Sequence, residues 1–536
     1  MSATLAMQRS RPGPWRFTFL IKLLALAALV ALADRLFFMA AGVGATLGIF
    51  VLALLLSLVA IRPDLRRSPA ALVAAGATGW FGFWLVDDPG PLGLALAWIA
   101  LTMTVLLPRA ARFGNGLRWA PRLFLHGLAT PVRPLQDLSR LSRARRRRSG
   151  RISLITLLST LVLPVAGSVL FLTLFAAANP LIEALLGKLD PTEMLFVSPL
   201  RLFFWGFIGL IVWRLLSPRL MLRGPASRSK VDWLDLPGIS IASVTLSLVT
   251  FNALFALQNG LDLAYLWSGA PLPEGMTLAQ YAHRGAYPLI FTALLAGGFV
   301  LVTTRPGTAI GKSGLIRRLV YLWIGQNVFL VASTMLRTID YIEAYLLTEL
   351  RIEALIWMAL VALGLVLICV RLALGRSSAW LINANLAAAA LVLAGSAALD
   401  YDRIAAGWNV RHAREVGGRG SPIDLCYLGQ MGDSALLPLI ALESRPLTPE
   451  LRGRISWLRN LAMNRLEERQ AHWQTWDWRG ARRLAAAREQ SAAHRLPRFR
   501  ADHDRRCDGR PHPRVQVAPP APTPAPPPPL TAGKGR

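Results

Sequence analysis

Ionisable and polar side chains that can do chemistry gather in one part of an otherwise apolar sequence. Arg337, Asp340 and Glu343 recur every third residue, which places them on one face of a helix. Carboxylates beside a guanidinium can bind a polar ligand through paired charges. The candidate ligand-binding residues of this region are Asp262, Tyr281, Arg284, Arg337, Asp340, Glu343, Glu349 and Arg351.

Two interpretations of these residues stay open. An ionisable group at the centre of a membrane helix costs about 2.5–3.5 kcal/mol, so it is a functional candidate. At the membrane surface the same groups reach water and can form a belt with tyrosines that anchors the helices. Six of the 8 tyrosines lie from Tyr265 to Tyr345, which fits such a belt. Gln326 and Asn327 lie deeper and are expected to hydrogen-bond between helices.

Enzyme motifs are weak in this sequence. We find no phosphate-binding glycine loop, no dinucleotide-binding fingerprint, no zinc-protease motif and no nucleophile elbow. The 7 histidines are scattered, and neither a metal nor a cofactor is expected. A membrane-embedded transferase with Asp262, Asp340 or Glu343 as base remains an alternative.

These residues must be positioned by membrane helices. The chain has 536 residues, 54% hydrophobic and 17% charged, whereas a soluble domain is nearer a quarter charged. A spanning helix needs about 20 mostly apolar residues. The predicted spans are 17–33, 40–60, 69–86, 92–107, 152–176, 199–216, 236–257, 285–303, 315–335, 353–374 and 378–399. The predicted fold class is therefore all-α, a polytopic transmembrane bundle of about eleven spans followed by a short, mainly helical C-terminal region.

The charges of the connecting segments predict the orientation. Basic segments alternate with balanced or acidic ones along all the predicted spans, and basic segments stay in the cytoplasm. This places the N-terminus in the cytoplasm and residue 400 outside. The net charge of +29 is explained by these segments, so nucleic-acid binding is not expected.

Composition divides the chain further. A basic start followed by Ala31-Leu32-Ala33 also resembles a signal peptide, although the apolar run resumes at Leu36. Arg145, Arg146, Arg147 and Arg148 end a long basic segment and are predicted either to contact anionic lipid or to fix orientation. The predicted parts are four transmembrane helices (1–107), a basic cytoplasmic interfacial segment (108–151), the main transmembrane bundle (152–399), an extracytoplasmic helical basic region (400–510) and a Pro-rich disordered tail (511–536).

The cysteines bear on the location of the C-terminal region. Cys369 lies in an apolar run, whereas Cys426 and Cys507 follow the last span. If this region lies outside the cytoplasm, these two can form a disulfide. The sequence alone does not decide whether they pair.

Several short motifs carry a family resemblance. They include the segments 251–260, 278–285, 336–351 and 433–438, the second containing Gln280-Tyr281-Ala282-His283-Arg284-Gly285. The region resembles bacterial membrane proteins of the domain-of-unknown-function family 4173, relatives of family 4153, although His283 departs from the usual pattern. The resemblance implies a bacterial inner-membrane protein and no catalytic residue. We expect a non-enzymatic sensor or envelope-assembly component with an unknown protein partner; the alternatives are a secondary transporter and the transferase.

Overall fold

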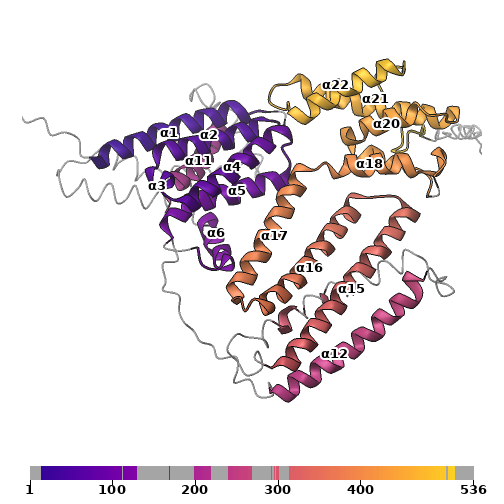
Figure 1. The fold of residues 1–536 in the computed structure, drawn as a ribbon. Helices are drawn as coiled ribbons and strands as arrows, with labels where there is room; N and C mark the ends of the chain where they lie inside the picture. The colour runs from indigo at the N-terminus through magenta and orange to yellow at the C-terminus, as the bar shows by residue number, and fades with distance from the viewer. Residues whose placement is uncertain are drawn as a thin grey trace, which may run out of the picture.

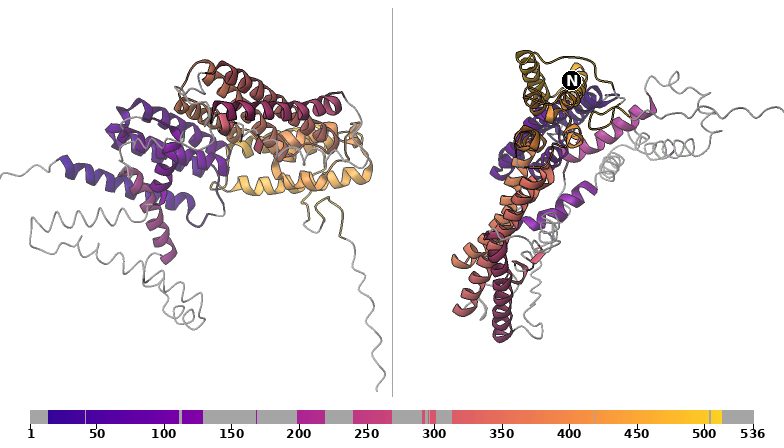
Figure 2. Two further views of the ribbon diagram at one scale, coloured as in Figure 1. Left: turned by 90° about the horizontal axis from the view of Figure 1, so that it is seen from below. Right: turned by 90° about the vertical axis from the view of Figure 1, so that its right-hand side faces the viewer.

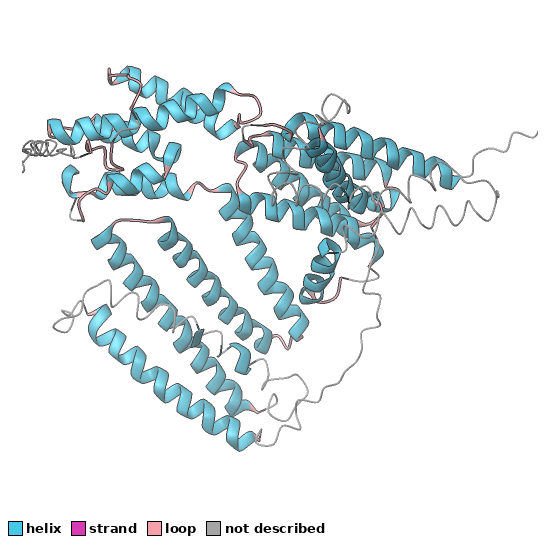
Figure 3. Ribbon diagram, turned by 180° about the vertical axis from the view of Figure 1, so that it is seen from behind, coloured by secondary structure: helices cyan, strands magenta, loops and turns pink. Residues whose placement is uncertain are grey.

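A computed structural model of the chain is helical throughout the part that it describes (Figure 3). That part comprises residues 14–40, 42–110, 113–128, 168, 198–218, 240–268, 291–292, 295, 297–300, 313–418, 420–502 and 505–512. Its only strand-like feature is an isolated bridge between Arg505 and Pro511. The predicted all-α fold is confirmed.

Five long helices form an N-terminal bundle, drawn from indigo to magenta in Figure 1. Its elements are α1 (Pro14–Phe37), α2 (Thr46–Ile61), α3 (Pro63–Arg66), α4 (Pro69–Asp87), α5 (Pro91–Leu106) and α11 (Pro199–Leu216). Leu29, Ala33 and Leu36 of α1 pack into the core of this bundle with residues of α2, α5 and α11. The structure therefore uses α1 as a core helix of this bundle. The short elements η1 (Leu107–Arg109), η2 (Gly116–Arg118) and α6 (Trp119–Leu128) follow α5.

Four further helices lie side by side in a row (Figure 1). The helix row consists of α12 (Ile241–Asp262), α15 (Gly314–Tyr345), α16 (Glu349–Ala373) and α17 (Ser378–Ala398), and a π-helical turn, η4 (Leu263–Trp267), extends α12. The right-hand view of Figure 2 shows the row nearly edge-on, as a single layer. Trp323 packs among Phe251, Phe255 and Phe299 in its core.

The C-terminal region (residues 400–512) is a small helical domain with its own core. Its elements are α18 (Tyr401–His412), η5 (Arg414–Val416), α19 (Leu425–Gln430), η6 (Gly432–Ala435), α20 (Leu436–Glu443), α21 (Pro449–Ala471) and α22 (Trp478–Ala493). Ile342 and Leu347, at the α15–α16 turn, join its main cluster of buried residues. The predicted helical region after residue 400 is thus packed both on itself and on the helix row. Residues 513–536, most of the predicted tail, lie outside the described residues.

Helix starts follow local capping chemistry. Thr448 caps α21 by accepting a hydrogen bond from the Leu451 amide, with Pro449 in the first turn. Ser68 caps α4 in the same way, again followed by a proline. These signals explain why several boundaries were readable from the sequence.

Seven of the described helices are long and apolar enough to cross a membrane, and α2 is a shorter apolar helix. All but two of the predicted spans correspond to described helices. The exceptions, 152–176 and 285–303, lie largely outside the described residues.

Contacts sort the helix ends into two sets. At one set, the Ala45 amide donates to the Trp476 carbonyl at 2.7 Å, and the Leu347 amide donates to Asn409 Oδ1 at 2.7 Å. At the other set, the Gly116 amide donates to Asn383 Oδ1 at 2.8 Å. The first set joins segments that the charge pattern assigned to the outside, and the second joins segments assigned to the cytoplasm. For the described segments that these three contacts join, the grouping agrees with the sides that the charge pattern predicts.

Candidate functional site

A cavity of about 730 Å³ lies where the N-terminal bundle, the helix row and the C-terminal region meet. It lies beside the α4–α5 turn, the start of α16 and the end of α17. Its ionisable lining residues are Asp88, Glu349, Glu353, Asp400, Asp402, Asp433, Asp477, Arg469, Arg479 and Arg483. Carboxylates thus outnumber guanidiniums around this space.

The guanidiniums of the cavity are already occupied. Arg479 donates to Asp87 at 3.0 Å and to Asp88 at 2.8 Å, which ties α22 to the α4–α5 turn. Arg483 bridges Asp400 and Asp433. Arg469 contacts Asp433 at 3.1 Å and Asp477 at 3.4 Å. These residues hold the C-terminal region in place and are not free for a ligand anion.

Three carboxylates remain without a cation. Among the described residues, none forms an ion pair with Glu349, Glu353 or Asp402. Burial raises the pKa of Asp402 to about 6, with a further contribution from the negative charges of Glu349 and Asp400. The pKa of Asp433, which burial alone would raise, is held below its usual value by Arg483 and Arg469. The site therefore favours a ligand group that carries positive charge.

Close backbone approach secures the same junction. The α1–α2 loop meets the α21–α22 turn, and a Cβ atom on Gly44 would lie 2.3 Å from the Trp476 carbonyl oxygen. Glycine at this position is therefore needed for the two segments to meet. The ring of Phe83 contacts Trp478 at 6.0 Å between centroids.

The structure does not bring the eight predicted ligand-binding residues together in one site. Asp262 and Arg337 form an ion pair in which both side chains are buried, with exposed fractions of 2% and 7%. Gln258 also donates to Asp262, at 3.1 Å. Of the six that the structure describes, Glu349 alone lines the cavity.

The remaining predicted residues lie elsewhere. Arg351 donates to the carbonyls of Tyr345 and Leu346 and lies 4.1 Å from the ring centroid of Tyr341, so it closes the α15–α16 turn. Asp340 is partly exposed and Glu343 exposed near the end of α15. Tyr281 and Arg284, like Arg145, Arg146, Arg147 and Arg148, lie outside the described residues.

The deeper polar residues were predicted to bond between helices. Gln326 does so, because its Nε2 donates to Asn252 of α12 at 2.9 Å. Asn327 instead donates to Trp323 of its own helix at 2.8 Å. The prediction of a hydrogen bond between helices is therefore confirmed for Gln326. It is wrong for Asn327, whose hydrogen bond lies within α15.

Most cavity residues were missed by sequence reasoning. Asp88 is not singled out from the sequence, and Asp400, Asp402 and Arg483 are placed in a helical basic region without a binding role. The signal available was the clustering of Asp400 with Asp402 directly after a span, together with Asp433 in a family-like motif. Nothing local indicated that these segments meet Glu349.

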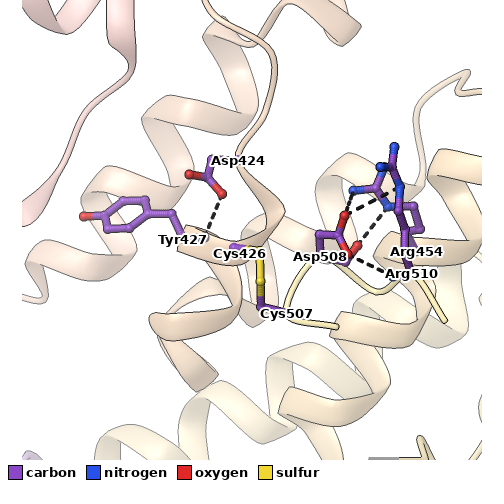
Figure 4. Close-up of a disulfide and its surroundings, with 7 residues drawn as sticks. All are labelled: Asp424, Cys426, Tyr427, Arg454, Cys507, Asp508 and Arg510. Carbon is purple, nitrogen blue, oxygen red and sulfur yellow. Dashed lines mark hydrogen bonds and ion pairs between the residues drawn. A yellow bond between two sulfur atoms is a disulfide. The ribbon is translucent and has the colours of Figure 1, made fainter. Parts of the chain in front are cut away.

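A disulfide joins Cys426 of α19 to Cys507, across a sequence separation of 81 (Figure 4). Beside it, Arg454 donates to Asp508 at 3.0 Å (Figure 4). Trp457 of α21 donates to Asp502 at 2.8 Å. These contacts fasten the segment after α22 onto α21. Within the described part of the chain, no group of histidine, cysteine or carboxylate side chains is arranged to hold a metal.

Comparison with known proteins decides the family. Residues 18–442 match the family described as "Domain of unknown function (DUF4153)". The chain belongs to this family. The match covers the N-terminal bundle, the helix row and the C-terminal region as far as α20. The sequence motifs were compared above with family 4173, and the matched family, DUF4153, is its relative. No curated protein and no solved structure matches this DUF4153 chain.

Proposed function

We propose that this DUF4153 protein is a non-enzymatic component of the bacterial inner membrane, a sensor or an envelope-assembly partner. In this proposal the N-terminus is cytoplasmic and the C-terminal region lies outside. The proposal includes the narrower resemblance to family 4173. It also includes contact with anionic lipid through Arg145, Arg146, Arg147 and Arg148. A membrane-embedded transferase remains a lower-ranked alternative in this proposal.

The orientation is supported by two observations. Among the described residues, Arg62 donates to the Val105 carbonyl beside the α5 end, and the Gly116 amide donates to Asn383 near the start of α17. These basic connections therefore meet at one set of helix ends, as the positive-inside rule expects of the cytoplasmic side. The disulfide between Cys426 and Cys507 suits an oxidising compartment such as the bacterial periplasm. Both favour a C-terminal region outside the cytoplasm.

The observation that carries the recognition role is the junction cavity. Its guanidiniums are paired, while Glu349, Glu353 and Asp402 face the space without a cation among the described residues. A cationic group of a ligand or a partner protein would relieve the mutual repulsion of these carboxylates. Because the cavity is shared by membrane helices and the C-terminal region, binding there would bias how the two pack.

Spermidine is a suitable cationic probe for purified protein in lipid nanodiscs, with Trp357 of the cavity lining as one source of a fluorescence signal. We expect the triple variant Glu349→Gln, Glu353→Gln, Asp402→Asn to bind spermidine at least about tenfold more weakly. The matched control is Glu450→Gln with Glu468→Gln, two exposed carboxylates of α21, which should leave binding unchanged. Equal affinity of wild type and triple variant would refute the recognition site.

A secondary transporter of a small solute is the second candidate. It is favoured by the buried ion pair of Asp262 and Arg337 between two membrane helices, because intramembrane charges commonly mark solute pathways. Solute flux in proteoliposomes that is lost in Asp262→Asn would favour this candidate. If the proteoliposomes show no flux of any tested solute, the sensor or envelope-assembly role is favoured.

A further inference from the structure

Exposed tryptophans gather at the turn between α21 and α22. Trp473, Trp476 and Trp478 follow one another closely in the sequence, and they are 61%, 37% and 43% exposed. The residues between them, Thr475 and Asp477, are buried. The turn itself is therefore packed against the protein, and its large indole rings face outward. Apolar surface of this size commonly marks an interaction site.

This tryptophan turn is fixed at one end of the N-terminal bundle. The Ala45 amide, in the loop between α1 and α2, donates to the Trp476 carbonyl at 2.7 Å. At the start of α2, Thr46 Oγ1 donates to the Gln474 carbonyl at 3.4 Å. The tryptophan turn therefore lies where apolar helices end, at the level where a membrane surface is expected.

One face of α4 is apolar and exposed along its length. Val73, Gly76, Trp80 and Phe83 recur at spacings of three and four residues, which places them on one side of the helix, and all four are exposed. The helix is long and apolar enough to cross a membrane. An exposed apolar side of such a helix is covered by lipid. We call these four residues the α4 stripe.

The tryptophan turn continues the α4 stripe. The ring of Phe83, one helical turn before the end of α4, contacts the ring of Trp478 at 6.0 Å between centroids. Arg482 lies 5.6 Å from the centroid of the Trp478 ring and pairs with Asp87 at the end of α4. Trp478 thus lies between an apolar, lipid-facing surface and a charged helix end. Tryptophan favours this level of a bilayer, because its ring is apolar and its N–H group can bond polar headgroups.

We propose that the tryptophan turn docks on the surface of the membrane that α4 spans, with Trp473, Trp476 and Trp478 in the phospholipid headgroup region. Continuity with the α4 stripe favours phospholipid as the occupant, because a protein partner would have to cover a surface that runs into the bilayer. The exposed guanidinium of Arg482 adds a group that suits lipid phosphate. Lipid would then hold the C-terminal region in addition to the contacts of Arg479.

The test places a fluorescent label on the full chain in nanodiscs of phosphatidylethanolamine and phosphatidylglycerol. In a Cys369→Ser background that keeps the disulfide between Cys426 and Cys507, Trp473→Cys takes up a nitrobenzoxadiazole maleimide. A nitroxide on the headgroup of added phosphatidylcholine should quench this label, because interfacial apolar groups lie about 5–10 Å into the headgroup boundary. Iodide in the water should quench it weakly.

The matched control is Glu450→Cys in the same background. Glu450 is exposed in the first turn of α21, and this helix has 23 residues. The control label therefore lies about 30 Å from the tryptophan turn. It should be quenched by iodide and not by the lipid nitroxide, the reverse of the label at position 473.

Each other outcome decides against the proposal. Equal quenching of the two labels by iodide would place the tryptophan turn in water. A label at position 473 that neither quencher reaches would mean that protein covers the turn. If Trp473→Cys does not fold, His472→Cys, at the neighbouring exposed position, takes the label with the same expected response. None of these positions lines the junction cavity, so the result is independent of spermidine binding there.

Discussion

Arg479 of α22 lies 3.0 Å from the Asp87 carboxylate and 2.8 Å from that of Asp88, across more than 390 positions of sequence. Its third contact, 3.1 Å to the Ala398 carbonyl, reaches the end of the last described membrane helix. One side chain thus joins the N-terminal bundle, the helix row and the C-terminal region. Docking of the C-terminal region therefore depends on a few charged contacts as well as on apolar packing.

Replacing Arg479 by alanine should release this junction. The variant leaves the buried Asp87 carboxylate, 6% exposed, with fewer hydrogen bonds, and a hydrogen bond to a charged group contributes about 1.5–3 kcal/mol. We expect faster hydrogen exchange at the start of α22 and a lower Tm. Arg488→Ala is the control, since Arg488 pairs with Glu467 at the surface and exposed pairs contribute about 0–1 kcal/mol. Equal exchange rates in the two variants would contradict the importance of this contact.

The pH dependence of stability should change on replacing Asp402 by asparagine. Burial and the charges of Glu349 and Asp400 raise the pKa of Asp402 to about 6 in the folded protein. Because the pKa is higher in the folded than in the unfolded protein, ionisation of Asp402 lowers the free energy of unfolding. This loss of stability is complete above the folded-state pKa and disappears as the pH falls below the pKa of the unfolded chain. Asp402→Asn should therefore be more stable than the wild type at pH 8 and equal to it near pH 4. Thermal unfolding at several pH values measures this difference.

The comparison must be made between variants at each pH. Asp433 has a lowered pKa, so its stabilising pairs with Arg483 and Arg469 are lost in acid and lower the stability of both proteins. Glu468→Gln, at an exposed carboxylate of α21, should show no pH-dependent difference from wild type. A constant offset for Asp402→Asn from pH 4 to pH 8 would contradict the assigned pKa.

The sequence predicted the described long helices well because each lies in an apolar run bounded by charges, prolines or capping residues, as at Ser68-Pro69. It also brought Asp262 and Arg337 into one predicted cluster, and they form an ion pair. It did not predict the cavity, because Asp88, Glu349 and Asp402 belong to three segments far apart in the chain. Pairing among such segments depends on tertiary packing, which leaves no periodic signal in the sequence.

The disulfide gives a prediction about both stability and location. In intact cells, a membrane-impermeant maleimide should label Cys426 and Cys507 only after treatment with a reductant. Labelling that requires cell lysis would place the C-terminal region in the cytoplasm and contradict the proposed orientation. Cys426→Ser with Cys507→Ser should lower the free energy of unfolding by about 2–4 kcal/mol. Cys369→Ser, at the free cysteine, is the control and should leave the effect of reductant on Tm unchanged.

The buried pair of Asp262 and Arg337 should show strong non-additivity. Asp262→Asn or Arg337→Gln alone removes one half of a buried ion pair, which costs about 3–5 kcal/mol in proteins. The double variant removes both charges of the pair, so its destabilisation should be smaller than the sum of the two single effects. Unfolding of all four proteins in the same lipid yields the coupling energy of a double-mutant cycle. A coupling energy near zero would mean that the pair, although in contact, does not stabilise the α12–α15 interface through its charges.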